Sequence, residues 1–146
     1  MKILVINGPN LNLLGKRNVK VYGEKSLEEI GEELIKEANR VGIELEMFQS
    51  NHEGEIIDRI HNFSGVDGII INPGALCHYS YSLRDAIEAV PIPVIEVHIS
   101  NIFSREEFRS RSVTAGVCRG FISGFGWKVY LFALHIIYNI LKNGNP

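Results

Sequence analysis

The chain alternates short apolar runs with longer stretches in which apolar positions recur every three or four residues. Some runs are continuously apolar, as in strands buried on both faces of a sheet, whereas residues 43–49 alternate as in a half-exposed edge strand. We predict strands at 2–6, 43–49, 67–72, 93–98 and 117–123. We predict helices at 26–42, 53–63, 80–90 and 127–141, with a short, charged helical piece at 104–111.

Strands that alternate with helices predict an α/β fold, because successive parallel strands need a crossover connection. Five such strands favour a flavodoxin-like, five-stranded parallel sheet in the order 2-1-3-4-5, with helices on both faces. The sequence contains no linker, internal repeat or low-complexity segment, so residues 1–146 are predicted to form a single domain. In such a sheet, ligands bind beyond the carboxyl ends of the strands, near the switch in strand order.

An unusually long connection separates the first strand from the first helix, which begins with a capping box at Ser26. Loops longer than about 12–15 residues are usually functional lids or disordered segments. This one contains leucines, valines and a tyrosine, which disordered segments lack. We therefore expect an unstructured but ordered lid at about 11–25, which with the residues before it brings Asn10, Arg17 and Tyr22 to the end of the first strand.

Composition narrows the function classes. The formal net charge of −2 gives no reason to expect a nucleic-acid partner. No apolar run reaches about 18 residues, so we expect no membrane span. No basic-then-apolar stretch opens the chain, so we expect no secretory signal and a cytoplasmic location. Cys77 and Cys118 lie far apart and fit no CxxC pattern, which favours two free thiols.

Polar residues follow the predicted strands at the edge where a ligand binds in this kind of sheet. They include three arginines: Arg17, Arg105 and Arg109. Together with Asn72 and exposed backbone amides, these arginines make a plausible pocket for a carboxylate. Each arginine alone can equally be a surface charge, and Tyr22 can be an apolar anchor of the lid. His98 ends a strand on the ligand side, where it is either a functional group or a hydrogen-bonded structural histidine.

The common cofactor motifs are missing from the sequence. No GxGxxG follows the first strand and no GxxxxGK[ST] occurs anywhere, so a nucleotide phosphate site is not predicted. The five histidines show no HExxH or paired-ligand spacing, so we predict no metal ligands and no cofactor.

A series of motifs nevertheless runs through nearly the whole chain. It comprises Asn-Gly-Pro-Asn-Leu at 7–11, Leu-Gly-Lys-Arg at 14–17, Tyr-Gly at 22–23, Gln-Ser-Asn at 49–51, Asn-Pro-Gly-Ala at 72–75, Leu-Arg-Asp-Ala at 83–86, Pro-Val-Ile-Glu-Val-His-Ile-Ser-Asn at 93–101, Arg-Glu-Glu-Phe-Arg at 105–109 and Gly-Phe-Ile-Ser-Gly-Phe-Gly at 120–126. The series resembles the type II 3-dehydroquinate dehydratases. The resemblance implies a single catalytic domain that converts 3-dehydroquinate to 3-dehydroshikimate through an enolate, a step of the shikimate pathway, with no metal and no Schiff-base lysine.

The resemblance also implies the catalytic residues. Tyr22 would take the proton next to the ketone, and Arg17 would activate this tyrosine. His98 would be the general acid that protonates the departing hydroxyl, with Glu96 orienting its ring. Asn10 would hold a water on the enolate oxygen.

Substrate-binding residues follow from the same resemblance. Asn72 and the backbone of Ile99 and Ser100 would hold the substrate carboxylate, and His78 and Arg109 would hold ring hydroxyls. In addition, Arg105 would support the tyrosine side of the site. Asp85 would reach the pocket of a neighbouring subunit in a homo-oligomer, a dodecamer built from trimers.

Two other classes of function remain open for this sequence. One is a flavodoxin-like module that binds a small anion or a flavin phosphate without catalysis, and it needs the arginines but not Tyr22 together with His98. The other is a metal-dependent lyase, which a chelator would inactivate. Cys77 and Tyr79 flank His78 where small hydroxyl-bearing residues are more usual in the family, which leaves the details of hydroxyl recognition open. Residues 113–115 fall in a variable stretch that decides nothing about function.

Overall fold

The computed structural model describes residues 1–144, so the last two residues of the predicted domain lie outside the described part. Five parallel strands form one sheet in the order β2-β1-β3-β4-β5, which confirms the predicted topology. The strands are β1 (Lys2–Asn7), β2 (Glu44–Gln49), β3 (Gly68–Asn72), β4 (Val94–His98) and β5 (Gly120–Ser123). The helices are α1 (Val19–Tyr22), α2 (Leu27–Val41), α3 (Glu53–His61), α4 (Tyr81–Ala89) and α5 (Lys128–Asn143).

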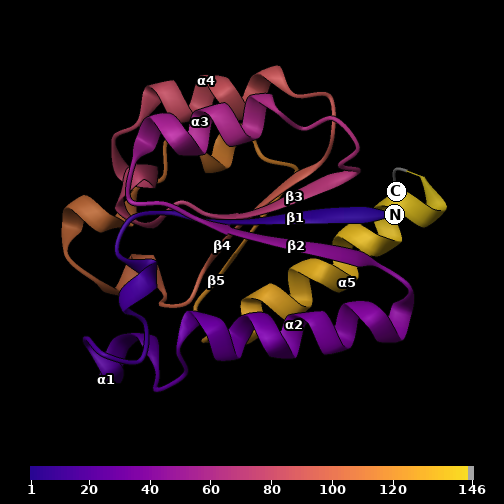
Figure 1. The fold of residues 1–146 in the computed structure, drawn as a ribbon. Helices are drawn as coiled ribbons and strands as arrows, with labels where there is room; N and C mark the ends of the chain where they lie inside the picture. Colours follow the sequence, from indigo (N-terminus) through magenta and orange to yellow (C-terminus); the bar gives the residue numbers. More distant parts are fainter. Residues whose placement is uncertain (145–146) are drawn as a thin grey trace.

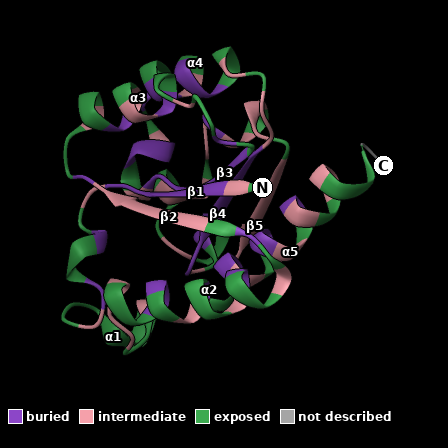
Figure 2. Cartoon of the chain, turned by 45° about the vertical axis from the view of Figure 1, so that its right-hand side comes forward, coloured by how far each residue is buried: buried purple, intermediate pink, exposed green. Residues whose placement is uncertain are grey.

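The helices cover both faces of the sheet, α3 and α4 on one side and α2 and α5 on the other (Figure 1). Successive residues of a strand point to opposite faces, so each central strand supplies both layers of the core. In β1, Ile3 and Val5 pack on the α2–α5 side, whereas Leu4 and Ile6 pack on the α3–α4 side. Figure 2 shows the result: buried residues gather on the central strands β1, β3 and β4 and on the inward faces of the helices.

The ends of α2 follow from local sequence, as predicted. Ser26 is its N-cap: the serine hydroxyl accepts from the backbone N–H of Glu29, and the Glu29 carboxylate accepts from the backbone N–H of Ser26. Gly42 ends the helix in the left-handed conformation, with φ of 76°.

Three local predictions were wrong: those for the segment after β1, for residues 104–111 and for the start of the last strand, which begins at Gly120 and not at residue 117. The segment after β1 is not unstructured, because it forms a 3₁₀ turn at Leu11–Leu13 and the single helical turn α1. Residues 104–111 are not one helical piece. They divide between 3₁₀ turns at Ile102–Ser104 and Glu107–Ser110, because the backbone of Arg105 and Glu106 is extended.

Short 3₁₀ turns also lie at Gly74–His78, after β3, and at Ala115–Val117, before β5. Within residues 1–144, the structure contains no helix with the length and apolar character needed to cross a membrane.

Candidate active site

A pocket lies at the carboxyl ends of β1, β3 and β4, the end of the sheet nearest α1 in Figure 1. The pocket is partly open to solvent. Ten of the residues predicted from the sequence line it: Asn10, Arg17, Tyr22, Asn72, His78, His98, Ile99, Ser100, Arg105 and Arg109. Among the described lining residues are three arginines and no carboxylate, so the pocket favours an anion.

Two arginines flank the tyrosine that α1 brings to the pocket. Arg105 donates from Nη1 to the Tyr22 hydroxyl at 2.7 Å, and its guanidinium carbon lies 5.3 Å from the ring centroid. The guanidinium carbon of Arg17 lies 5.5 Å from the same centroid. A positive charge beside a phenol stabilises its ionised form, so this arrangement suits a tyrosine that acts as a base.

The histidine at the end of β4 is backed by a buried carboxylate. Glu96 and His98 are two residues apart on one strand, and therefore on the same face, and Nε2 of His98 lies 2.7 Å from Oε1 of Glu96. Glu96 is fully buried. It also accepts from the hydroxyls of Ser112, at 2.7 Å, and Thr114, at 2.6 Å. These bonds satisfy a buried charge that would otherwise be costly.

This arrangement determines which nitrogen of His98 serves the pocket. A carboxylate only accepts hydrogen bonds, so the Nε2 nitrogen beside Glu96 carries a hydrogen. A further proton then resides on Nδ1, for which no other group within residues 1–144 is a hydrogen-bond partner. His98 lines the pocket, so Nδ1 is the ring nitrogen left available to a bound ligand.

A buried polar chain fixes Asn72 at the floor of the pocket. Asn72 donates from Nδ2 to the Tyr130 hydroxyl at 2.9 Å, and this hydroxyl donates to Oδ1 of Asn7 at 2.6 Å. The backbone N–H of Gly74 donates to Oδ1 of Asn72 at 3.2 Å. Burial raises the pKa of Tyr130, so its hydroxyl keeps the hydrogen that it donates. One amide hydrogen of Asn72 is left for a ligand.

His78 and Arg109 also line the pocket. Nδ1 of His78 lies 2.7 Å from the backbone carbonyl oxygen of Arg111, which can only accept, so Nδ1 is the donor and Nε2 is an acceptor in the neutral ring. Arg109 pairs through Nε with Oε2 of Glu106 at 2.9 Å. The backbone of Glu106 and the nearby arginines hold the pKa of its carboxyl below the usual range.

The turn after β1 places Asn10. Its backbone is left-handed, with φ of 69°, and its N–H donates to Oδ1 of Asn51 at 2.9 Å. The turns after β1 and β3 touch here, because the N–H of Gly8 donates to the carbonyl of Asn72 at 2.8 Å. A Cβ on Gly8 would lie 2.4 Å from the carbonyl oxygen of Pro73, so this contact requires glycine.

Two of the predicted residues do not line the pocket. Glu96 lies behind His98, as an orienting group would. Asp85 is an exposed residue of α4, outside the pocket of its own chain.

Sequence reasoning missed the supporting residues. Thr114 belongs to the stretch judged uninformative, yet it is fully buried and donates to Glu96. Asn7 belongs to a strand end and Tyr130 to the last helix, but the hydrogen bond that joins them across 123 residues of sequence was not predicted. One chemical signal in the sequence could have pointed to them. A buried strand that carries an acidic residue needs hydrogen-bond donors from other parts of the chain.

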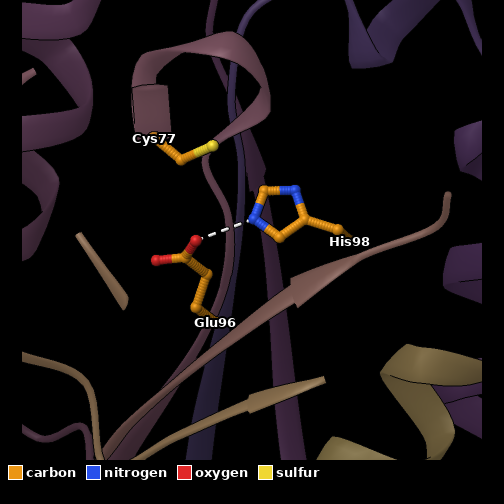
Figure 3. A group of neighbouring side chains, drawn as sticks. All are labelled: Cys77, Glu96 and His98. Carbon is orange, nitrogen blue, oxygen red and sulfur yellow. Dashed lines mark hydrogen bonds and ion pairs between the residues drawn. The ribbon is translucent and has the colours of Figure 1, made fainter. Parts of the chain in front are cut away.

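The fold also brings together three groups that could ligate a metal. Donor atoms of Cys77, Glu96 and His98 all lie within 4.8 Å of one another, and all three residues are buried (Figure 3). Glu96 and His98 are two residues apart on β4, whereas Cys77 comes from the turn after β3, so no single local motif contains all three residues. Burial raises the pKa of the Cys77 thiol, and the neighbouring Glu96 raises it further.

Fold and pocket together define a doubly wound α/β protein with an arginine-lined pocket at the switch in strand order, and the pocket also contains a tyrosine and a histidine backed by a buried carboxylate. Comparison with known proteins gives the family. The sequence profile of the family described as "Dehydroquinase class II" matches residues 1–138. The chain therefore belongs to the class II dehydroquinase family.

Individual relatives agree with this assignment. The chain is 60% identical over 145 residues to a protein of Halothermothrix orenii named 3-dehydroquinate dehydratase, covering 99% of this chain and 98% of the relative. It is 57% identical over 142 residues to the protein of the same name from Thermotoga maritima, covering 97% and 98%. The crystal structure of type II dehydroquinase from Butyrivibrio crossotus superposes with a TM-score of 0.93 at 52% identity, covering 94% of this chain and 97% of that one.

Proposed function

We propose that this chain removes water from 3-dehydroquinate to give 3-dehydroshikimate, a step of the shikimate pathway, through an enolate intermediate. Family membership and the names of the relatives support this activity. One observation carries the proposal. A single arginine-lined pocket contains a phenol beside two guanidiniums and an imidazole backed by a buried carboxylate. The dehydration needs a base that removes a proton and an acid that protonates the departing hydroxyl. Both groups must lie in one pocket that binds an anionic substrate.

Tyr22 is the proposed base. As a phenolate it takes the proton from the carbon next to the ketone, and the electron pair left behind forms the enolate. Arg17 activates the phenolate. The hydrogen bond from Arg105 to the Tyr22 hydroxyl supports a contribution of this second arginine to the same activation. Asn10 holds a water at the enolate oxygen.

His98 is the proposed acid. When the enolate returns to the ketone, the bond between carbon and the departing hydroxyl breaks. Nδ1 of the imidazolium gives its proton to that oxygen, which leaves as water. Glu96 orients the ring and balances its charge, and the bonds from Ser112 and Thr114 support this role.

The remaining pocket residues bind the substrate in this proposal. Asn72 and the backbone of Ile99 and Ser100 hold the carboxylate, supported by the free amide hydrogen of Asn72. His78 and Arg109 hold ring hydroxyls. The acceptor Nε2 of His78 suits a hydroxyl donor.

Three wider expectations belong to the same proposal. Residues 11–25 act as the active-site lid of a single catalytic domain, because an enolate must be shielded from bulk water. The enzyme works in the cytoplasm as a dodecamer built from trimers. In this assembly Asp85 reaches a neighbouring subunit's pocket, and its exposure on α4 supports that role.

The activity is tested by following the ultraviolet absorbance of the conjugated product from 3-dehydroquinate. We expect turnover by the wild type and a loss of about 10²–10⁴-fold in kcat for His98→Asn. His61→Asn, at an exposed position of α3, is the matched control and should keep full activity. A folded wild-type protein without turnover, purified with a bound yellow cofactor, would instead favour a flavin-binding module.

A further inference from the structure

We propose that the cluster of Cys77, Glu96 and His98 is an inhibitory site for a soft divalent cation such as Zn²⁺, which disables the active site when it binds. The effect on catalysis rests on the proposed function, whereas binding of the cation does not. The cation is an inhibitor here and not a cofactor.

The geometry of the cluster is close to what zinc needs. The donor atoms already lie within 4.8 Å of one another. Zinc bonds to sulfur, nitrogen and oxygen at about 2.0–2.3 Å, which puts the ligands of a tetrahedral site about 3.3–3.7 Å apart. Side-chain shifts of about 1 Å therefore suffice. The three side chains converge from β4 and from the 3₁₀ turn after β3 (Figure 3).

The donor types select the metal. A thiolate, an imidazole and a carboxylate form a mixed set that suits Zn²⁺ or Cd²⁺, whereas Mg²⁺ prefers oxygen ligands and several waters. Cys77 supplies the soft ligand and is not among the described residues that line the pocket. Three protein ligands leave one coordination position for water.

Protons balance as follows when the metal binds. The Cys77 thiol loses one proton to solvent and becomes a thiolate. The imidazolium of His98 that acts as the proposed acid loses its Nε2 proton to solvent and keeps the hydrogen on Nδ1, so that Nε2 can bind the metal in the place of its bond to Glu96. A ring that binds metal through Nε2 cannot also become an imidazolium, so the acid needed to protonate the departing hydroxyl is lost.

The hydrogen bonds of Glu96 are the reason why we do not expect the metal to assist the reaction. Its carboxylate is already satisfied by His98, Ser112 and Thr114. The cluster is therefore complete as a hydrogen-bonded support for the acid, and a cation competes with that support.

The test uses the full-length protein, freed of metal with a chelator and then exchanged into chelator-free buffer. Zn²⁺ alone is titrated against the initial rate with 3-dehydroquinate, with Mg²⁺ as the control cation. We expect Zn²⁺ to inhibit the wild type and Mg²⁺ to have no effect. In Cys77→Ser, which should keep its activity, half-inhibition should require at least about tenfold more Zn²⁺. Equal inhibition of both proteins, or no inhibition of an active wild type, would overturn the proposal.

A second readout is independent of activity. Cd²⁺ bound to a thiolate has an ultraviolet charge-transfer band, which we expect at one equivalent in the wild type and in Cys118→Ser but not in Cys77→Ser. Cys118→Ser retains Cys77, so it also tests the site if the Cys77 variant does not fold. Sγ of Cys118 lies 3.9 Å from Oε2 of Glu96, so a band lost in Cys118→Ser and kept in Cys77→Ser would overturn the proposal. Absence of the band from both the wild type and Cys118→Ser would refute the site. A band from a protein without dehydratase activity would leave the site in place and refute only the proposed function.

Discussion

Replacing Arg105 tests whether positive charge beside Tyr22 drives proton abstraction. Arg105 donates to the Tyr22 hydroxyl at 2.7 Å, and the two residues are joined by this bond across 83 residues of sequence. The phenol must ionise before it can act as a base, and the guanidinium stabilises the ionised form. Two unit charges about 4 Å apart attract by about 4 kcal/mol at an effective dielectric of about 20.

We expect Arg105→Met, which removes the charge and keeps an apolar stem, to lower kcat by about 10²–10³-fold, because each 1.4 kcal/mol is worth a factor of about ten. Arg17 stays beside the same ring and preserves part of the stabilisation. Arg105→Lys keeps the charge but not the planar fork, so its loss should be about tenfold. KM should change less than kcat, because the interaction strengthens only as the phenolate forms.

The assay is the initial rate of product absorbance, measured over a range of substrate concentrations and pH. The reasoning is refuted if Arg105→Met keeps kcat within about threefold of the wild type, or if its whole loss lies in KM.

Three further substitutions test the supporting structure. Thr114→Val removes a donor to the buried glutamate, so kcat should fall about tenfold and the free energy of unfolding in urea should fall by about 1–3 kcal/mol. Thr114→Ser should restore both quantities, and an unchanged kcat in Thr114→Val would contradict this. Tyr130→Phe leaves the Asn72 amide without a partner, so KM should rise by about threefold to tenfold with little change in kcat; a loss confined to kcat would count against it. Gly8→Ala forces a Cβ to 2.4 Å from a backbone carbonyl oxygen and should lower Tm and activity together, unlike Gly54→Ala, which meets no atom within 4 Å.

Much of the fold could be predicted because each element carries its own signal. The continuously apolar strands and the amphipathic helices are local patterns, and their alternation leaves few topologies. The spacing of Glu96 and His98 was also readable, since residues two apart on a strand share a face. The strand-end rule then located the pocket itself.

The remaining parts of the site depend on contacts between distant residues, which no local sequence pattern encodes. Only the family resemblance placed Arg105 near Tyr22: the bond between them requires two irregular segments to meet, and their backbone was predicted wrongly in both places. Thr114 reaches Glu96 from a loop whose composition looks ordinary. Such contacts are set by packing around a buried charge and become visible only in three dimensions.

Tyr22→Phe gives the most direct test of the central claim that a phenol in this pocket starts a metal-free dehydration. Its rate of product formation from 3-dehydroquinate should be measured beside that of the wild type, with a chelator present and after borohydride treatment. The account predicts that the wild type survives both reagents, while the folded variant still binds substrate but loses nearly all turnover. Wild-type activity abolished by borohydride or chelator, or a fully active Tyr22→Phe, would contradict it.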